Sequence, residues 1–298
     1  MKERIGFVGV GLMGEGMATN LVRKGWPLTV LAHRKREPIE RPVALGAEEA
    51  RSARALAEVS DIVVLCVTGS PQVEEVTMGA EGLASAGKRL LILDCSTSNP
   101  ASTLQLAAEL AKREIVMIDA PLARTPKEAA AGMLDVMVGG DATSFVRARP
   151  VLEAFAGRVI HTGPTGSGHT MKLLNNFISL GYSAIYSEAL MMGAKAGLTP
   201  KVMDSVLRGG RMDCGQYQAF FEFVLRRDEN AQRFSMNNAL KDLSYLASFA
   251  VSAGVANPVS AVVRNSFATA TGAGQGEKFV PALSDAIAKA NGVSLAGS

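Results

Sequence analysis

Short, fully apolar runs alternate with amphipathic segments over the first half of the chain. The runs at 61–67 (DIVVLCV) and 89–94 (RLLILD) are apolar at consecutive positions, which is typical of strands covered on both faces. Similar runs predict further strands at 5–10, 28–31, 115–119 and 136–139. Helical spacing between the runs predicts helices at 13–25, 47–58, 71–78, 100–112 and 142–155. Strands that alternate with helices predict an α/β domain with a doubly wound, mostly parallel sheet of the Rossmann type.

The pattern changes after Gly163-Pro164. From there on apolar residues recur at helical spacing, and no further strand is expected. Helices are expected at 172–196, 200–208, 216–225, 237–253 and 258–271. We therefore expect two domains, a Rossmann-type domain over residues 1–163 and an all-helical domain over 164–298 that begins with a long interdomain helix.

The composition is that of a folded protein with no obvious polyanionic partner. Hydrophobic residues make up 48% of the 298 residues and charged residues 20%, which allows a large buried core. The net charge of +3 comes without a dense basic block, and aromatic residues are only 5%, so we expect no nucleic-acid partner. There is no stretch of eighteen uncharged apolar residues, so we expect no membrane partner.

Three widely spaced cysteines, Cys66, Cys95 and Cys214, form neither a disulfide framework nor a zinc-ligand pattern. We therefore expect no metal, and a reducing, cytoplasmic location. The apolar run at the N-terminus is interrupted by glycines, which argues against a signal peptide.

A glycine-rich turn follows the first predicted strand and opens the first predicted helix. The turn matches G-x-G-x-x-G and consists of Gly9, Val10, Gly11, Leu12, Met13 and Gly14. In this context the first glycine permits a tight turn, the second lets a pyrophosphate approach the backbone, and the third lets helix and strand pack closely. The helix N-terminus offers N–H groups and a positive dipole end to the phosphates. A purely structural glycine turn is the alternative, but the strand–helix alternation around it favours a bound dinucleotide.

The end of the second predicted strand indicates which dinucleotide is bound. An acidic residue there would favour NAD, but no acid occurs before Glu37. The stretch is basic instead, with His33, Arg34, Lys35 and Arg36. Because guanidinium groups pair with phosphate in a bidentate manner, we expect NADP(H) to be the preferred cofactor and NAD(H) a weaker one. A solvated basic loop is the alternative interpretation.

The segment HTMKLLNN (169–176) places polar residues in an otherwise apolar helix. Residues three or four apart share a helix face, so His169, Lys172 and Asn176 point the same way. Two interpretations are open: a lysine whose stem lies on apolar surface while its ammonium reaches water, or an acid/base lysine with an orienting amide. His169 is open in the same way, as a polar lid or as a group that tunes the lysine.

Four motifs occur in order along nearly the whole chain. They are IGFVGVGLMGEGMATNL (5–21), DCSTSNP (94–100), GSGHTMKLLNN (166–176) and LKDL (240–243). In this combination the chain resembles the β-hydroxyacid dehydrogenases, a family that includes 3-hydroxyisobutyrate dehydrogenase, 2-hydroxy-3-oxopropionate (tartronate semialdehyde) reductase and the glyoxylate/succinic semialdehyde reductases.

The resemblance implies a role for each matching residue. Lys172 becomes the catalytic acid/base and Asn176 its partner one turn on. This agrees with the chemistry, because hydride delivery to a carbonyl leaves negative charge on oxygen that an amine can protonate and an amide can hydrogen-bond. The remaining implied cofactor contacts are Val67, Thr68, Thr97 and Lys241. The implied substrate contacts are Ser96, Ala123, Arg124, Thr125, Lys172, Asn176, Phe234 and Lys241.

One loop departs from the family pattern. Where the family usually reads DAPVSGG, residues 119–125 read DAPLART. Ala123 has no hydroxyl to offer a substrate carboxylate, whereas Arg124 brings a guanidinium that could clamp one in a bidentate manner. An arginine that points to solvent is equally open. The family's substrates therefore do not transfer directly to this chain.

The sequence predicts an NADP-dependent oxidoreductase that interconverts a small β-hydroxyacid and the corresponding aldehyde acid. An imine reductase shares this architecture but generally lacks the lysine, so Lys172 argues against it. A non-catalytic dinucleotide-binding interaction module is the third alternative, and the intact glycine turn and Lys172 argue against that. The expected partners are a small carboxylate-bearing substrate and further copies of the chain, in a homodimer or homotetramer.

Overall fold

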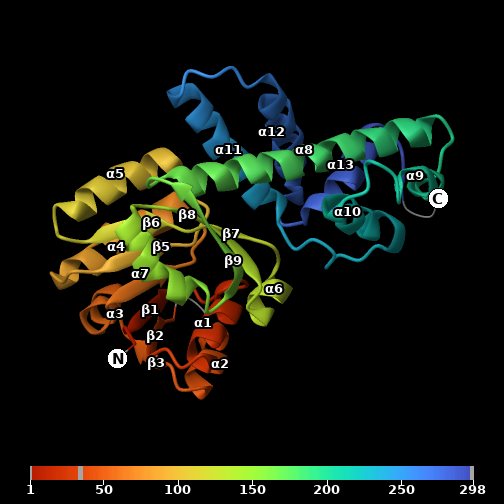
Figure 1. Cartoon of the computed structure of the whole chain (residues 1–298). Coiled ribbons are helices and arrows are strands. Elements are labelled where there is room, and N and C mark those ends of the chain that lie inside the picture. The colour runs from red at the N-terminus through yellow and green to blue at the C-terminus, as the bar shows by residue number, and fades with distance from the viewer. Residues whose placement is uncertain (1, 33–35, 296–298) are drawn as a thin grey trace. The chain divides into compact units, whose positions relative to one another are not determined.

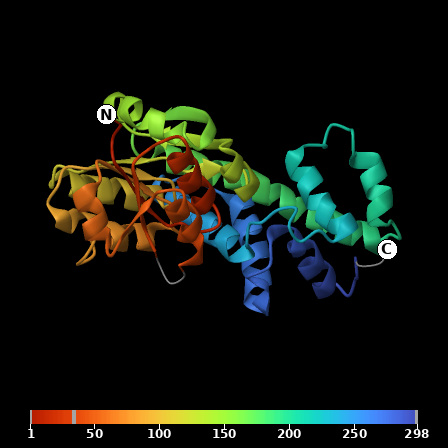
Figure 2. The same ribbon diagram turned by 90° about the horizontal axis from the view of Figure 1, so that it is seen from below.

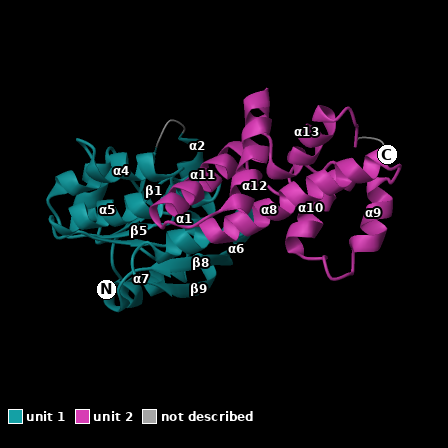
Figure 3. Cartoon of the chain, turned by 90° about the horizontal axis from the view of Figure 1, so that it is seen from above, with its two compact units in different colours: residues 1–172 teal, residues 173–298 magenta. Residues whose placement is uncertain are grey.

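The computed structural model describes residues 2–32 and 36–295. Within it the chain divides into two compact units, residues 1–172 and residues 173–298 (Figure 3). The first unit is an α/β domain and the second is helical, and each is described by itself below.

The first unit is built on a nine-stranded sheet in the order β3-β2-β1-β4-β5-β6-β8-β7, with β9 also paired to β8 (Figure 1). The strands are β1 (Ile5–Val8), β2 (Leu28–Leu31), β3 (Glu48–Ala50), β4 (Ile62–Leu65), β5 (Leu91–Asp94), β6 (Val116–Asp119), β7 (Leu122–Ala123), β8 (Leu134–Gly139) and β9 (Ala156–Gly163). The pairings from β3 through β6 are parallel, whereas β8 is antiparallel to β6 and β7. The predicted fold class, a mostly parallel Rossmann-type sheet followed by a helical domain, is confirmed.

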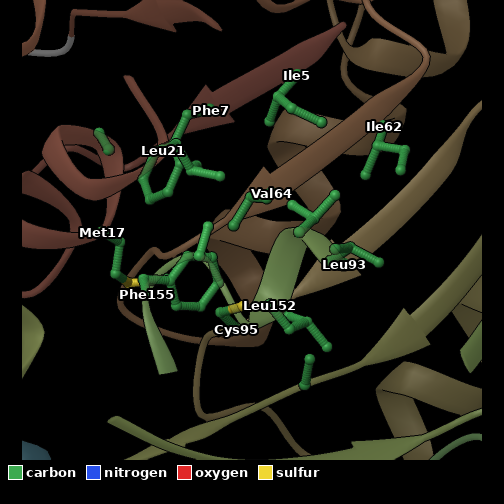
Figure 4. Packing of buried hydrophobic residues seen from close by; sticks show 14 of the residues in the cluster. Ile5, Phe7, Met17, Leu21, Ile62, Val64, Leu93, Cys95, Leu152 and Phe155 are labelled. Carbon is green, nitrogen blue, oxygen red and sulfur yellow. The ribbon is translucent and has the colours of Figure 1, made fainter. Parts of the chain in front are cut away.

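Helices cover both faces of this sheet. They are α1 (Gly14–Arg23), α2 (Glu37–Ala44), α3 (Ala53–Val59), α4 (Ser70–Met78), the short 3-10 helix η1 (Leu83–Ala86), α5 (Pro100–Ala111), α6 (Pro126–Ala131) and α7 (Ala142–Leu152). Side chains alternate along each strand: Ile62 and Val64 pack with α1 and α7 (Figure 4), whereas Val63 and Leu65 pack with α3, α4 and α5. Two apolar layers on one sheet explain why β4 and β5 are apolar at consecutive positions.

One prediction for this unit is wrong in detail, and four elements were missed. The helix predicted at 47–58 is the short strand β3 followed by α3, whose start is capped by the Ser52 hydroxyl accepting from the Ala55 N–H. Helices α2 and α6 and strands β7 and β9 were not predicted. β3 and β9 are mostly exposed or half-buried, so they lack the apolar run of a central strand, and α2 is rich in charged residues and proline.

The second unit contains the remaining helices. They are α8 (Ser167–Lys195), α9 (Pro200–Leu207), α10 (Gly215–Arg226), α11 (Met236–Ser252), α12 (Pro258–Ala270), the π-helical turn η2 (Thr271–Gln275), the 3-10 turn η3 (Val280–Ala282) and α13 (Leu283–Ala290). Aromatic side chains of α10, including Tyr217, Phe220 and Phe221, fill its core together with Leu180 of α8. No strand was expected beyond residue 163, and the described chain has none there; it has only an isolated β-bridge between Ser235 and Phe279.

Helix α8 begins in the first unit and is one unbroken helix (Figure 1); Figure 2 shows the same chain from below. It starts at Ser167, five residues before the predicted start, and α13 was not predicted. In the described part of the chain, no helix is both long and apolar enough to cross a membrane.

Candidate functional site

The glycine turn after β1 has the geometry that its sequence predicts. Gly9 has φ +96°, and a Cβ there would lie 2.2 Å from the Cys66 carbonyl oxygen. A Cβ on Gly14 would lie 2.1 Å from the Gly9 carbonyl oxygen. By contrast, nothing lies within 4 Å of the Cβ position of Gly11. Gly9 and Gly14 are therefore required by packing, whereas Gly11 leaves open space in front of the backbone, as close approach of a pyrophosphate requires.

The first turn of α1 is also suited to an anion. Met13 occupies the N-cap position, and no side chain caps the helix. Val10 is buried in the apolar layer between the sheet and helices α1 and α7 and holds the turn, whereas Leu12 is exposed. An uncapped helix start with a positive dipole end is a favourable place for phosphate, so the residues present fit a dinucleotide.

The basic loop after β2 is described only in part. His33, Arg34 and Lys35 lie outside the described residues. Arg36 stands at the N-cap of α2, and its guanidinium donates to Glu49 at 2.8 Å. An ion pair with an exposed carboxylate leaves guanidinium hydrogens for a further acceptor, because guanidinium carries five.

The loops after β4 and β5 are tied together at the carboxyl edge of the sheet. The Val67 N–H donates to the buried Ser96 hydroxyl oxygen at 3.0 Å. The Asp94 carboxylate accepts from the Ser96 N–H at 2.9 Å and from the Ser98 hydroxyl at 3.0 Å. Thr97 is half-buried in the same loop, and the side chain at position 68, a threonine, is exposed. Since β1, β4 and β5 are parallel neighbours, this loop pair and the glycine turn share one edge.

The start of α8 is anchored at the same edge by Asp119, the last residue of β6. Its fully buried carboxylate accepts from the Gly166 N–H at 2.6 Å and from the His169 N–H at 2.7 Å. A Cβ on Gly168 would lie 2.5 Å from the Met137 carbonyl oxygen of β8, so only glycine permits this close crossing. Lys172 follows one turn later, half-buried. A carboxylate held by helix N–H groups stabilises the first turn and fixes where Lys172 begins its side chain.

His169 is fully buried, which excludes the polar lid. Its Nδ1 lies 2.8 Å from the Thr103 hydroxyl of α5, and its Nε2 lies 3.2 Å from the Ser96 carbonyl oxygen. His161, at the end of the sheet in β9, has a structural environment: its Nε2 lies 2.7 Å from the Gly140 carbonyl oxygen, and its ring stacks on Phe145.

The loop that departs from the family pattern, at residues 123–125, is held by contacts within the first unit. Ala123 pairs with Asp135 across β7 and β8. Arg124 has φ +84°, a left-handed backbone that glycine prefers, and its Nε donates to Asp135 at 3.0 Å. Thr125 caps α6 in a capping box with Glu128. The Arg124 guanidinium, for which a substrate clamp and a solvent-facing side chain were both open, therefore has an internal carboxylate partner.

In the second unit, Asn176 and the lysine-aspartate motif of α11 lie together. The Asn176 amide donates to Asp242 at 2.7 Å, and the Lys241 ammonium lies 3.1 Å from the other oxygen of Asp242. Lys241 also lies over the ring of Tyr245. Phe234, half-buried, packs against the helical core. Asp242 was not predicted as a site residue; its place directly after Lys241 in the LKDL motif was the available signal.

The described residues hold no cluster of histidine, cysteine and acidic side chains that could bind a metal ion. The first unit thus brings the glycine turn, the loops after β4 and β5, and Lys172 to one sheet edge. The second unit separately groups Asn176, Asp242 and Lys241.

Known proteins match the chain over nearly its whole length. The family model for the NAD binding domain of 6-phosphogluconate dehydrogenase matches residues 4–163, and the model described as NAD-binding of NADP-dependent 3-hydroxyisobutyrate dehydrogenase matches residues 166–284. The chain is 32% identical over 296 residues to 2-(hydroxymethyl)glutarate dehydrogenase of Eubacterium barkeri, which covers 99% of this chain and 98% of that protein. It is also 32% identical over 287 residues to 2-hydroxy-3-oxopropionate reductase of Escherichia coli (strain K12), with 95% and 97% covered.

Solved structures give the same result. The crystal structure of 3-hydroxyisobutyrate dehydrogenase from Salmonella typhimurium matches with a TM-score of 0.85 at 29% identity, covering 96% of this chain and 100% of that chain. All three relatives are named as dehydrogenases or reductases, and all match this chain across both of its units.

Proposed function

We propose, starting from the fact that this chain belongs to the β-hydroxyacid dehydrogenase family, that it interconverts a small β-hydroxyacid and the corresponding aldehyde acid with NADP(H) as preferred cofactor. The chain is an NAD(P)-dependent dehydrogenase or reductase acting on CH–OH groups, as its relatives are. The observation that carries the finer proposal is the anchored start of α8. It holds Lys172 one turn beyond His169, whose N–H donates to Asp119, at the sheet edge that carries the glycine turn.

Residues of the first unit fit the cofactor. The turn from Gly9 to Gly14 would hold the pyrophosphate, and the loops at Val67, Thr68 and Thr97 would line the two halves of the dinucleotide. When bound, the nicotinamide supplies or accepts the hydride. The preference for the phosphorylated form rests on the cationic stretch that ends at Arg36 and on the lack of an acidic residue before Glu37.

Lys172 handles the proton. In reduction its ammonium donates a proton to the carbonyl oxygen as negative charge develops there, and in oxidation the neutral amine accepts the hydroxyl proton. Asn176 lies on the same face of α8 and supplies a neutral donor. An amide nitrogen carries two hydrogens; one is directed to Asp242, and the other remains for the substrate oxygen. Asp242 thus orients the amide through its carboxylate, and Lys241 balances the charge of that carboxylate.

The names of the relatives indicate a substrate class for this chain. Each name describes a hydroxymethyl or aldehyde carbon attached to the carbon that bears a carboxylate. We extend this class to the present protein, with the carboxylate received by the loop of Ala123, Arg124 and Thr125 and by Ser96 in the first unit. The family resemblance also assigns Phe234 and Lys241 to the substrate. Because Arg124 is paired with Asp135, a substrate carboxylate would either share the Arg124 guanidinium with Asp135 or displace Asp135 from it. The specific acid is therefore expected to differ from those of relatives with a serine–glycine loop.

The three cysteines are free thiols in the structure, which is consistent with work in a reducing compartment such as the cytoplasm.

The experiment is a matrix of substrates against cofactors. Glyoxylate, succinic semialdehyde and tartronate semialdehyde are each tested with NADPH and NADH, and the corresponding hydroxyacids with NADP⁺ and NAD⁺, following the absorbance of the reduced nicotinamide. Tartronate semialdehyde, in which the aldehyde is the β carbon of the acid, should be reduced with NADPH favoured over NADH. Glyoxylate and succinic semialdehyde, in which the aldehyde is the α and the γ carbon, test how strictly the β position is required. A cyclic imine serves as the control for the imine reductase alternative. Turnover of the imine together with inactivity on every acid would overturn the proposal.

A further inference from the structure

We propose that His169 is a positioning residue, which holds the loop of residues 95–99 at a fixed distance from the start of α8 and thereby aligns Lys172 with the reacting carbonyl. This inference rests on the proposed function, since it concerns the residue that we assign as acid/base. It is carried by two contacts of one fully buried imidazole, with α5 and with the loop after β5, and by the backbone N–H of the same residue, which donates to Asp119 at the helix start.

The proton on Nε2 is determined by its surroundings. This nitrogen lies 3.2 Å from the Ser96 carbonyl oxygen and 3.7 Å from Oδ2 of Asp94. Both are acceptors, so Nε2 carries a hydrogen and donates it to Ser96. The Thr103 hydroxyl lies 2.8 Å from Nδ1 and 3.2 Å from the Asn99 carbonyl oxygen, and it has one hydrogen for these two acceptors. Whichever of the two receives the Thr103 hydrogen, the bond from Nε2 to the Ser96 carbonyl is made.

Each of the two segments that this ring joins also has an aspartate that organises it. The loop after β5 is organised by Asp94, which accepts from the Ser96 N–H and the Ser98 hydroxyl. The start of α8 is organised by Asp119, which accepts from the Gly166 and His169 N–H groups. Asp94 and Asp119 are paired residues on adjacent strands. The imidazole adds a direct side-chain link between the loop and the helix start at this edge.

The link matters for chemistry because each end is adjacent to a reacting partner. Ser96 precedes Thr97, the expected nicotinamide contact, and His169 lies one helical turn before Lys172. If the loop shifts against the helix, the amine moves relative to the carbonyl that accepts the hydride. A substitution far from the reacting atoms that displaces a catalytic group by about 1 Å can lower the rate about 100-fold.

The test separates the two ring nitrogens. In His169→Gln the amide nitrogen can reach the position of Nε2 and keep the donor to Ser96. In His169→Asn the shorter amide reaches only the position of Nδ1, next to Thr103. His169→Met fills the volume without any donor, so it replaces His169→Asn if that variant does not fold. The matched control is His161→Asn, which removes the other imidazole contact with a backbone carbonyl, that of Gly140.

The expected result is a fall in kcat of roughly 10- to 100-fold in His169→Asn and in His169→Met, at saturating cofactor and substrate. His169→Gln should keep kcat within about threefold of the wild type, and His161→Asn should do the same. KM for the cofactor should change much less than kcat, because the glycine turn is untouched. If His169 only stabilised the fold, His169→Gln and His169→Asn variants of equal thermal stability would have equal kcat.

Amide hydrogen exchange gives a second readout that needs no substrate. His169→Asn should raise exchange in both segments, 95–99 and 167–172, whereas His169→Gln should not. Equal kcat in the asparagine and glutamine variants, or unchanged exchange in His169→Asn, overturns the positioning role. If the wild type turns over no aldehyde acid, the proposed function fails instead, and the exchange data still decide whether the ring links the two segments.

Discussion

Lys172 is the residue on which the proposed chemistry depends most directly. Lys172→Ala should still bind NADPH, because no cofactor contact is assigned to this side chain, but it should lose turnover by about 10²–10⁴-fold, the usual worth of a positioned acid/base. Cofactor binding is measured by fluorescence titration and turnover at saturating substrate. Lys195→Ala, in the last turn of the same helix, is the control. Near-normal activity of Lys172→Ala on the best substrate would show that the acid/base group lies elsewhere.

Arg124 combines a strained backbone with an internal ion pair. A non-glycine residue in the left-handed region costs about 1–3 kcal/mol and persists only where the surroundings impose it. If its guanidinium clamps the substrate carboxylate, Arg124→Ala should lose roughly 10–100-fold in kcat/KM for acidic aldehydes and little for neutral ones, since charged hydrogen bonds contribute about 1.5–3 kcal/mol.

Three aldehydes decide the role of Arg124: one acidic, one small and neutral, one bulky and neutral. Improved turnover of the bulky aldehyde alone would mean that Arg124 only narrows the pocket. Arg158→Ala is the matched control, because Arg158 lies 3.7 Å from the other oxygen of Asp135. Unchanged kcat/KM for the acidic aldehyde in Arg124→Ala would exclude the clamp.

The thiols of Cys66 and Cys95 should be inert in the folded protein. Burial raises the pKa of Cys66 to about 12, with a further contribution from the charge of Asp94. Burial also raises the pKa of Cys95, well above its usual value. Because the thiolate is the reactive form, both thiols should stay unreactive up to about pH 9, where an ordinary thiol ionises.

Alkylation followed by mass spectrometry should therefore label only Cys214, which is exposed, until denaturant is added. Labelling of Cys66 in the native state at neutral pH would contradict this expectation.

At the scale of elements, the loop between β2 and α2 is expected to select the cofactor. Replacing Arg34 and Arg36 together with alanine should weaken NADP(H) binding by about 10–100-fold and NAD(H) far less, because only NADP(H) carries the 2′-phosphate. Dissociation constants for all four cofactor forms are measured. Arg41→Ala, which changes a cation of α2 beyond this loop, is the control. Equal losses for both cofactors would remove the basis for NADP preference.

How far an element can be predicted depends on where its partners lie. β4 and β5 are buried on both faces, so their apolar runs identify them. β3 and β9 are largely exposed, so nothing in their sequences separates them from loops. The glycine turn could be predicted because its pattern is local, with Gly14 packed against the Gly9 carbonyl, although the contact of Gly9 with the Cys66 carbonyl could not. The start of α8 could not, because its cap is Asp119, 47 residues earlier in the chain.

The same reasoning applies to the candidate site. Lys172 and Asn176 could be proposed as a pair from the sequence because residues four apart on a helix share a face. Asp242, which holds the Asn176 amide, lies 66 residues away, and periodicity carries no information about such a pair. The internal partner of Arg124 escaped prediction for a related reason: Asp135 becomes its neighbour only through the antiparallel pairing of β7 and β8.

At the scale of the whole molecule, α8 has an apolar stripe that the described residues leave exposed. Ile178 and Ile185 are 54% and 61% exposed, and Met171, Leu174 and Tyr182 share the helical spacing. We expect this stripe to pair with another copy in a homodimer or homotetramer, because exposed apolar stripes on soluble proteins mark interaction sites.

Light scattering should therefore give a mass of at least two chains for the wild type. Ile178→Lys combined with Ile185→Lys should lower that mass. Val206→Lys, on α9, should not, although Val206 is more exposed than either isoleucine. A wild type with the mass of one chain at micromolar concentration would contradict the expected assembly.

The anchored start of α8 also determines which changes in length the chain tolerates. Because Asp119 fixes the first turn, one residue inserted between His169 and Lys172 would rotate the lysine by about 100° around the helix axis and move it by about 1.5 Å. The ammonium would then point to a different side of the helix, however conservative the inserted residue. Insertions after Gly254, in an exposed turn between helices, would carry no such penalty. Between His169 and Lys172 the chain can therefore vary in sequence, at positions 170 and 171, but not in length.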